Sequence, residues 1–323
     1  MTIEKVFTAG DWSKDDDDYS QMFVVQNLRQ FWLPEEISLS SDLLTWKALS
    51  EDEKLAYMRV LGGLTLLDTI QGDVGMPKIV DTVKSHQQKA VLSFMGGMEN
   101  AVHARSYSRI FITLATNEQI QDTFNWIHSN KHLQKKAKIF DHFYREAQRG
   151  GLDSYFAKVA SVALESFLFY SGFFYPLYLA GQGKLRASGE IISLIIRDES
   201  IHGVYVGLLA KDELKTLDAD KEEVEQLVYD LFDELLAIEE EYTREIYDPI
   251  GLTHEVLQFI KYNANKGLTN LGYDKRYDHD KVSSMVMTGL QTGNQKHDFF
   301  SQKSSSYKKP TVEATSDDDF NFD

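Results

Sequence analysis

Residues 159–178 read VASVALESFLFYSGFFYPLY, an almost unbroken apolar run that decides the fold class of this chain. A helix of about 20 apolar residues would be long enough to cross a bilayer. Glu165 and Pro176 interrupt the run, however. A helix that is apolar on all sides is also what the centre of a helical bundle requires. We therefore interpret this stretch as a core helix and predict no membrane span.

The rest of the chain also has the pattern of helices. Only five prolines and 20 glycines occur in 323 residues, and apolar residues recur at three- and four-residue spacing. Ser50 and the acidic residues after it have the pattern of an N-cap and first turn, for a helix expected to reach Gly72. The fold class is therefore predicted as all-α. The other expected helices are one unusually long helix over 77–112, and helices over 117–129, 133–148, 154–180, 188–209, 221–247 and 254–271.

The composition excludes several classes of function. The chain carries 50 acidic and 34 basic residues, a formal charge of −16, which disfavours binding to nucleic acid or to an anionic membrane. It has no cysteine, so disulfides, thiolate metal sites and thiol nucleophiles are ruled out. The first residues lack the basic start and apolar run of a secretory signal. We predict a cytoplasmic protein.

Four acidic residues stand where the core face of a helix should be apolar. They are Asp68, Glu99, Glu165 and Glu199, and each is embedded in an apolar segment. A carboxylate buried without a partner is strongly destabilising, so each of the four requires a cation, a proton or a salt bridge. The sequence therefore predicts a charged cluster inside the bundle.

Two histidines indicate what this cluster binds. His103 follows Glu99 by four residues and His202 follows Glu199 by three, and both spacings place the pair on one helical face. One such pair occurs by chance on many helices, as a surface pair or beside a hydrogen-bonded core histidine. Two pairs on apolar helices, with two further buried acids, match the ligands of a dinuclear carboxylate site in a four-helix bundle.

Charge balance supports a dinuclear site. The four carboxylates carry four negative charges, which two divalent cations neutralise while the imidazoles stay neutral. Oxygen-rich ligands with one nitrogen per metal and no sulfur favour iron or manganese over copper(I) or structural zinc. The residues thus predict a pair of iron or manganese ions in the core.

Taken together, these residues resemble the radical-generating small subunit of class I ribonucleotide reductase, and most closely its class Ib branch. The resemblance extends over nearly the whole chain. The motifs that carry it are Phe31-Trp32-Leu33-Pro34-Glu35-Glu36, Leu66-Leu67-Asp68, the segment from Glu99 to Tyr107, the segment from Leu164-Glu165 to Phe173, Arg197-Asp198-Glu199 with His202, and an acidic C-terminal segment containing phenylalanines.

The resemblance implies a homodimeric, ferritin-like helical bundle that holds two manganese or two iron ions per chain. It implies that Tyr107, one turn beyond His103, is oxidised to a stable tyrosyl radical. It also implies that Phe169, Phe173 and Ile195 form an apolar shell around that radical, although each could simply be core packing. By the same resemblance, one metal is held by Asp68, Glu99 and His103, and the other by Glu165, Glu199 and His202.

One position departs from the pattern of the family. Most members have Glu-x-x-His, whereas this chain has Glu99-Asn100-Ala101-Val102-His103. If Asn100 were the ligand, the cluster would lose a carboxylate and keep an excess positive charge. If Glu99 is the ligand, the extra residue must be absorbed, for example by a π-type bulge. Charge balance favours Glu99.

The resemblance further implies a route for radical transfer. Trp32 and Asp198 match a hydrogen-bonded pair that leads through His103 to the metals, and Tyr307 would relay the radical to the large subunit. Each of the three could otherwise be a structural residue. The composition changes after about residue 295. We predict a dimetal domain over 1–295 and a flexible tail over 296–323, whose Phe320 and Phe322 dock on the large subunit.

Two other classes of protein would share the predicted metal ligands. An iron-storage or detoxifying protein of the ferritin type would need no Trp32, Tyr107 or Tyr307. A diiron oxygenase should open a substrate pocket where this chain has bulky Phe169 and Phe173. The resemblance instead implies a large reductase subunit as partner and, if the metal is manganese, a flavodoxin-like activator protein.

Overall fold

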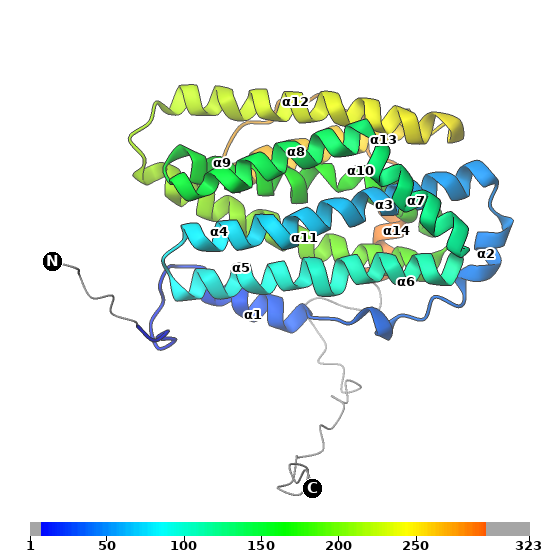
Figure 1. The fold of residues 1–323 in the computed structure, drawn as a ribbon, viewed down its shortest axis with the longest axis horizontal. Coiled ribbons are helices and arrows are strands. Elements are labelled where there is room, and N and C mark those ends of the chain that lie inside the picture. Colours follow the sequence, from blue (N-terminus) through cyan, green and yellow to red (C-terminus); the bar gives the residue numbers. More distant parts are fainter. Residues whose placement is uncertain (1–7, 295–323) are drawn as a thin grey trace, which may run out of the picture.

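The computed structural model describes residues 8–294, and this part of the chain is built from helices without a strand. Most helices run along the long axis of the molecule, so that the bundle is elongated (Figure 1). The predicted all-α architecture is confirmed. Residues 1–7 and 295–323, which include Tyr307, Phe320 and Phe322, lie outside the described residues.

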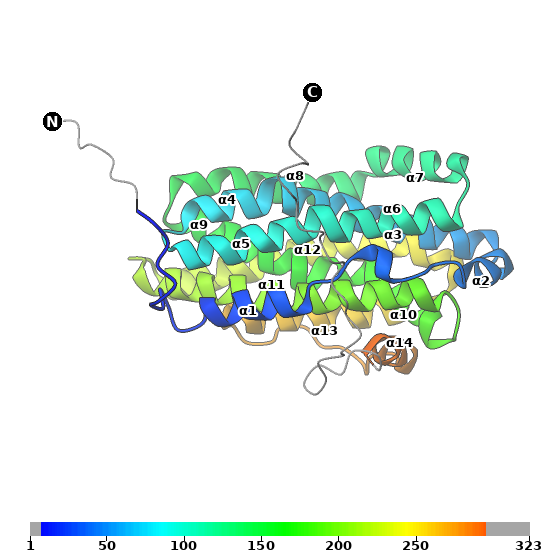
Figure 2. The same cartoon turned by 90° about the horizontal axis from the view of Figure 1, so that it is seen from below.

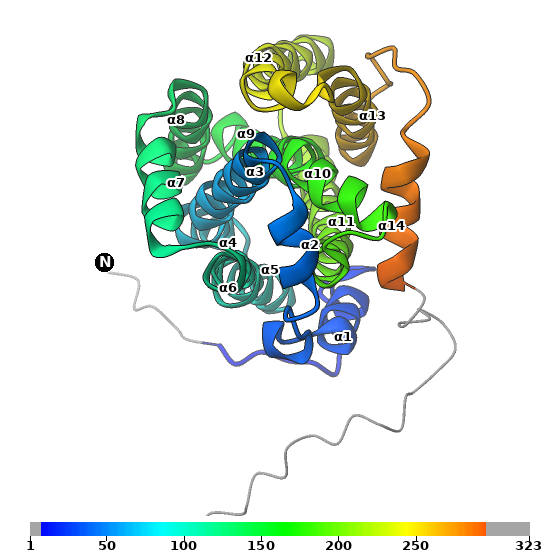
Figure 3. The ribbon, with the colours of Figure 1, turned by 90° about the vertical axis from the view of Figure 1, so that its right-hand side faces the viewer.

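Four helical rods form the centre of the bundle, and three of them contain or continue into a π-helical turn. An end-on view shows them side by side, with the remaining helices outside (Figure 3). The rods are α3 (Glu51–Ile70) with η2 (Gln71–Gly75); α5 (His86–Met98), η3 (Glu99–His103) and α6 (Ala104–Leu114); α9 (Leu152–Ala163), η5 (Leu164–Leu168) and α10 (Tyr170–Gly181); and α11 (Arg186–Thr216).

The other helices surround these rods. The N-terminal helix α1 packs against α5 and α11 along one side (Figure 2), and α14 packs against α10 and α11. Neither of these two helices, nor α2, was among the helices predicted from the sequence. Helix α4 (Met76–Thr82) continues the first rod beyond η2. The surrounding elements are α1 (Ser20–Gln30), η1 (Pro34–Glu36), α2 (Asp42–Ala48), α7 (Asn117–Ser129), α8 (Lys131–Glu146), η4 (Ala147–Arg149), α12 (Lys221–Tyr247), η6 (Asp248–Ile250), α13 (Thr253–Leu271) and α14 (Ser284–Asn294).

The predicted start of α3 is confirmed in detail. The Ser50 side chain accepts a hydrogen bond from the Glu53 backbone N–H, and the Glu53 carboxylate accepts one from the Ser50 backbone. This reciprocal capping satisfies two backbone donors that a helix start otherwise leaves unpaired. Asp68 lies in the last turn of α3, on the face of the helix that is buried in the core.

The predicted break at Gly72 and the single helix over 77–112 are both wrong. The chain passes from α3 through the π-helical turn η2 into α4 without leaving the helical path. It breaks instead after Thr82, because Val83 is extended and Ser85 starts α5 by accepting a hydrogen bond from the Gln88 backbone N–H. The hydroxyl of Ser85 also donates to Asp16, which ties the break to the N-terminal segment.

The apolar run at 159–178 lies in the core as predicted. Its helix continues from α9 through η5 into α10, and Glu165 lies within the π-helical turn. Phe167, Phe169 and Phe173 of this run are fully buried against neighbouring helices. Among the residues that the structure describes, no helix has the length and apolarity needed to span a membrane.

A buried carboxylate outside the predicted cluster orients α11, the helix that carries Glu199 and His202. Asp42 is 2% exposed and its carboxylate accepts hydrogen bonds from the backbone N–H groups of Ala187 (3.1 Å) and Ser188 (2.7 Å). A negative charge at a helix N-terminus is favourable because it faces the positive end of the helix dipole. The α2 segment therefore anchors the start of the longest core helix.

The break before α5 gives a test of the fold. Replacing Ser85→Ala removes the N-cap acceptor and the contact with Asp16, and we expect it to lower the free energy of unfolding by about 1 kcal/mol. Urea unfolding followed by circular dichroism measures the change. Ser93→Ala, at an exposed position within α5, is the control and should not destabilise. Equal stability of the two variants would contradict this account of the break.

Candidate metal centre

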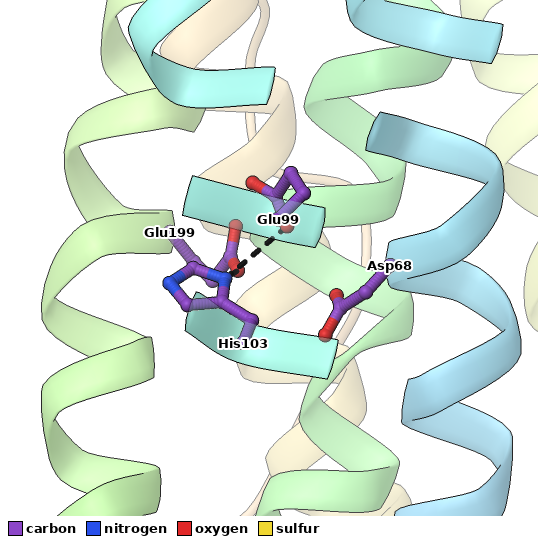
Figure 4. Close-up of side chains that lie close together, drawn as sticks. All are labelled: Asp68, Glu99, His103 and Glu199. Atoms are coloured by element: carbon purple, nitrogen blue, oxygen red, sulfur yellow. Dashed lines mark hydrogen bonds and ion pairs between the residues drawn. The ribbon is translucent and has the colours of Figure 1, made fainter. Parts of the chain in front are cut away.

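The six side chains predicted as metal ligands meet inside the bundle. They form two overlapping groups, in each of which the candidate ligand atoms lie within 4.8 Å of one another. Figure 4 shows the first group, with Asp68 on α3 facing the η3 turn and Glu199 approaching from α11. All six side chains are fully buried. The groups are Asp68, Glu99, His103 and Glu199, and Glu99, Glu165, Glu199 and His202.

The extra residue between Glu99 and His103 is accommodated by a π-helical turn. This turn, η3, spans Glu99–His103, and it widens the helix at the point where the sequence analysis expected a π-type bulge. Glu99 faces the cluster, whereas Asn100 is exposed and its side-chain amide donates to Asp73 Oδ1 at 3.0 Å. The geometry therefore favours Glu99 over Asn100 as the ligand.

Glu99 and Glu199 lie between the two imidazoles. His103 Nδ1 is 3.2 Å from Glu99 Oε2 and 2.9 Å from Glu199 Oε1. His202 Nδ1 is 2.9 Å from Glu99 Oε1 and 3.4 Å from Glu199 Oε2. Both histidines thus direct Nδ1 into the cluster, and both carboxylates are shared between the two groups. This is an arrangement in which carboxylates can bridge two ions.

The donor set fits two divalent cations. Within residues 8–294, the four buried carboxylate oxygens of Asp68 and Glu199 make no hydrogen bond of ordinary geometry, although Tyr107 and the two imidazoles lie near them. Burying an ionised carboxylate without a compensating partner is costly, and oxygen-rich ligand sets with imidazole nitrogen suit iron and manganese. The four negative charges of the cluster match two divalent ions. Buried carboxylate oxygens that converge with two imidazoles, without ordinary hydrogen bonds, are therefore the structural sign of a metal centre.

The electrostatics of the cluster agree with this interpretation. Burial, together with the charges of Glu99 and Glu199, raises the pKa of Asp68, and burial is also the main cause that raises the pKa of Glu165. Burial opposes the charged forms of both histidines, but the surrounding carboxylates outweigh it and raise their pKa values. Despite its burial, Glu99 has its pKa lowered to about 2 by His103 and His202. Without a metal, the cluster balances its charge by holding protons.

Tyr107 lies beside the first group of ligands. It is located on α6, one turn after His103, and is fully buried. Its hydroxyl interacts with the Asp68 carboxylate, although the pair does not reach ordinary hydrogen-bond geometry. Burial, and next the charge of Asp68, raise the pKa of Tyr107, so that the phenol keeps its proton. Tyr107 was singled out among 16 tyrosines because it follows His103 by four residues, and the structure places its phenol next to the cluster.

The three residues predicted as an apolar shell are all fully buried. Phe169 and Phe173 pack on each other with ring centroids 5.9 Å apart, and Ile195 is buried on α11. Their burial is consistent with a dry interior around the cluster. Their role in protecting a radical stays a prediction.

A hydrogen-bonded chain leads from Trp32 to the cluster. The indole N–H of Trp32 donates to Asp198 Oδ2 at 2.7 Å, and the same oxygen is 3.3 Å from His103 Nε2. Trp32 and Asp198 are both buried, and the indole stacks over the His103 ring at 6.5 Å between centroids. The structure therefore brings together Trp32, Asp198 and His103 in the order expected from the sequence.

Sequence reasoning missed several buried polar residues around the cluster. Gln30 donates to Asp198 Oδ1 at 3.0 Å, and Gln71 donates to Glu165 Oε1 at 2.7 Å. Gln71 had a detectable signal, since it follows Asp68 by three residues on the same helical face. Gln30 had none, because its partner is 168 positions away in the chain.

The fold and the cluster together define a ferritin-like helical bundle with a dinuclear carboxylate–histidine centre. The family model for the ribonucleotide reductase small chain matches residues 11–284. This chain belongs to that family, the small chains of the enzyme that reduces ribonucleotides with a large subunit as partner.

Individual relatives agree with this assignment over their whole lengths. The ribonucleoside-diphosphate reductase subunit beta of Bacillus subtilis is 55% identical over 323 residues, which cover 99% of this chain and 98% of the relative. The ribonucleoside-diphosphate reductase 2 subunit beta of Escherichia coli is 40% identical over 326 residues and covers all of both chains. The crystal structure of dimanganese(II)-NrdF from Streptococcus sanguinis superimposes with a TM-score of 0.84 at 42% identity, covering 88% of this chain and 100% of that one.

The raised pKa values predict that metal binding releases protons. A divalent ion must displace the protons held by Asp68, Glu165 and the two histidines, so we expect the affinity for Mn(II) to rise as the pH increases above 6.5, the ordinary pKa of histidine. Calorimetric titration of the metal-free protein in buffers of different ionisation enthalpy counts the released protons. An affinity that does not change with pH would contradict this electrostatic account.

The same shifts predict the pH dependence of the metal-free fold. Groups with a raised pKa hold protons more tightly in the folded than in the unfolded chain. Their stabilising contribution is therefore complete below the unfolded pKa and is lost as the pH rises through the folded pKa. Glu99 has a lowered pKa, so its ionised form stabilises the fold, and this contribution is lost only as the pH falls below 4.5. The melting temperature of the metal-free protein should fall as the pH rises above 6.5, and Mn(II) should suppress the fall.

Proposed function

We propose that this chain assembles a dimetal centre that converts Tyr107 into a tyrosyl radical, and that it passes the oxidising equivalent to the large subunit. The observation that carries the proposal is the environment of the Tyr107 hydroxyl. It is fully buried, it interacts with the carboxylate of the candidate ligand Asp68, and burial and then the Asp68 charge raise its pKa. Tyr57 is also buried, but the charges that raise its pKa come from Asp42 and Tyr175 and not from the cluster.

The ligand sets support two ions per chain. Asp68 and His103 occur only in the first group, Glu165 and His202 only in the second, and Glu99 and Glu199 in both. This sharing supports Glu99 and Glu199 as candidate bridges. When bound and first oxidised by dioxygen or an oxidant derived from it, the metal pair would accept one electron from Tyr107, while the phenolic proton would pass to a nearby base. Two manganese ions are one proposal, because the similar Streptococcus sanguinis structure contains dimanganese(II), and two iron ions are the alternative with the same ligands.

The surroundings of Tyr107 suit a long-lived radical. The phenol is fully buried, as are Phe169, Phe173 and Ile195. The Asp68 carboxylate interacts with the Tyr107 hydroxyl and can accept the phenolic proton. We propose that Phe169, Phe173 and Ile195 keep the pocket dry.

Trp32 and Asp198 support a route between the centre and the protein surface. Loss of an electron from the Trp32 indole makes its Nε1–H acidic, and Asp198 Oδ2 is placed to accept that proton at 2.7 Å. The same carboxylate oxygen lies 3.3 Å from His103 Nε2, which links the indole to a ligand of the first group. We propose that Tyr307 continues this route toward the large subunit.

The family assignment implies a dimer and a large-subunit partner. We further propose that the C-terminal segment 296–323 binds the large subunit through Phe320 and Phe322, and that residues 1–295 form the dimetal domain. If manganese is the native metal, we propose a flavodoxin-like protein as activator. We also place the chain in the cytoplasm, with no role in binding nucleic acid.

Substitution of Tyr107 tests the proposal directly. After loading with metal and activation, wild type should show a tyrosyl radical by electron paramagnetic resonance, and Tyr107→Phe should lose it while binding the same amount of metal. Tyr57→Phe is a matched control, because Tyr57 is also fully buried with an unpartnered hydroxyl. A radical that persists in Tyr107→Phe, or is lost equally in Tyr57→Phe, would contradict the assignment.

Substitution of Trp32 separates radical formation from radical transfer. We expect Trp32→Phe to keep the Tyr107 radical in the activated protein but to reduce ribonucleotide turnover with the large subunit to background, because no indole N–H faces Asp198. Trp46→Phe, which also replaces a buried tryptophan, should retain turnover. Full turnover by Trp32→Phe would exclude this route.

A further inference from the structure

A second fully buried tyrosine is connected to the cluster by side-chain hydrogen bonds. Tyr144 lies on α8, outside the four central rods, and its hydroxyl contacts the Oε1 of Gln71. Gln71 is the first residue of the π-helical turn η2 and is also fully buried. Its Nε2 donates to Glu165 Oε1 at 2.7 Å and to Ser161 Oγ at 2.8 Å. The chain from Tyr144 thus ends on a candidate metal ligand.

The direction of these hydrogen bonds follows from their chemistry. When Glu165 is ionised, as a metal ligand is, its carboxylate only accepts, so the NH2 of Gln71 faces Glu165 and the amide oxygen faces Tyr144. The Tyr144 hydroxyl is therefore the donor in its contact with Gln71. The hydroxyl of Ser161 approaches the other carboxylate oxygen, Glu165 Oε2, at 3.5 Å. Each oxygen of Glu165 thus has a neutral donor near it, Gln71 at Oε1 and Ser161 at Oε2.

The absence of a side chain at Gly75 leaves the space in which Gln71 and Tyr144 meet. A Cβ atom added at Gly75 would come within 2.5 Å of Gln71 Oε1 and 2.7 Å of the Tyr144 ring. Any larger residue at this point of the turn would push the amide and the phenol apart. The π-helical turn and the glycine together hold the amide between Tyr144 and Glu165.

We propose that Tyr144 and Gln71 are positioning residues that fix the Glu165 carboxylate for the second metal ion. The proposal deepens the proposed function, on which it rests. Partners outside the ligand shell orient a ligating carboxylate, and their loss typically weakens metal binding by about 10- to 100-fold. The hydroxyl of Tyr144 contacts Gln71, and the Gln71 amide in turn contacts Glu165. We therefore place Gln71 as the main link between Tyr144 and this candidate ligand.

The two ligand groups make the effect selective. Glu165 occurs only in the group with Glu99, Glu199 and His202, and is absent from the group that contains Asp68 and His103. Disturbing Glu165 should weaken one of two metal-binding steps and leave the other unchanged. General damage to the core would weaken both.

Titration of the metal-free protein with Mn(II) tests the proposal. The six-line electron paramagnetic resonance signal of free Mn(II) gives both dissociation constants. For Tyr144→Phe we expect one of the two to increase by about 10- to 100-fold, and the other to stay as in wild type. The control is Tyr155→Phe, because Tyr155 is also buried but its hydroxyl contacts Tyr273 at 2.6 Å and not the cluster. The control should bind both ions normally.

A second variant tests whether Tyr144 acts through Gln71. Gln71→Met removes the amide at similar size and should weaken the same binding step. Adding Tyr144→Phe to Gln71→Met should then cause no further loss, because the intermediary is already absent. The proposal is overturned if Tyr144→Phe binds both ions normally, if it weakens both steps equally, or if the two losses are additive. Wild type that binds fewer than two ions would instead refute the dinuclear centre itself.

Discussion

The interaction on which the whole structure depends is the attraction between four buried carboxylates and the positive charge that must accompany them. Asp68, Glu99, Glu165 and Glu199 are fully buried within one bundle, and the oxygens of Asp68 and Glu199 make no hydrogen bond of ordinary geometry within residues 8–294. Protons can compensate the charge of the metal-free cluster, and two divalent ions can replace them. The rest of the molecule provides a dry apolar enclosure that keeps these charges in contact with each other rather than with solvent.

Three of the four helical rods that carry the ligands depart from regular α-helix near the cluster. A π-helical turn follows Asp68, another spans Glu99–His103, and a third contains Glu165. Such turns are rare in proteins, but those that occur are often found at functional sites, because they rotate side chains out of the regular helical register. In this chain they direct Glu99 inward past an extra residue and place Gln71 against Glu165. Only α11 approaches the cluster as an unmodified helix.

The sequence predicted the fold class and the members of the cluster because both depend on local spacing. Apolar periodicity predicts helices, and an acid three or four residues before a histidine predicts a shared face, so His103 and His202 could be placed without tertiary information. The break at Ser85 could not be predicted, since a tertiary contact with Asp16 accompanies its local cap. The hydrogen bond between Tyr144 and Gln71 joins residues that are 73 positions apart, so no local sequence pattern predicts it.

The central claim is that the six ligands hold two metal ions in place of protons. Anomalous diffraction from crystals loaded with Mn(II) measures this directly, because each bound ion appears as a separate peak. We predict two peaks inside the bundle, one contacted by Asp68 and His103, the other by Glu165 and His202, with Glu99 in the ligand shell. A single peak, or Asn100 in the ligand shell with Glu99 outside it, would contradict the account.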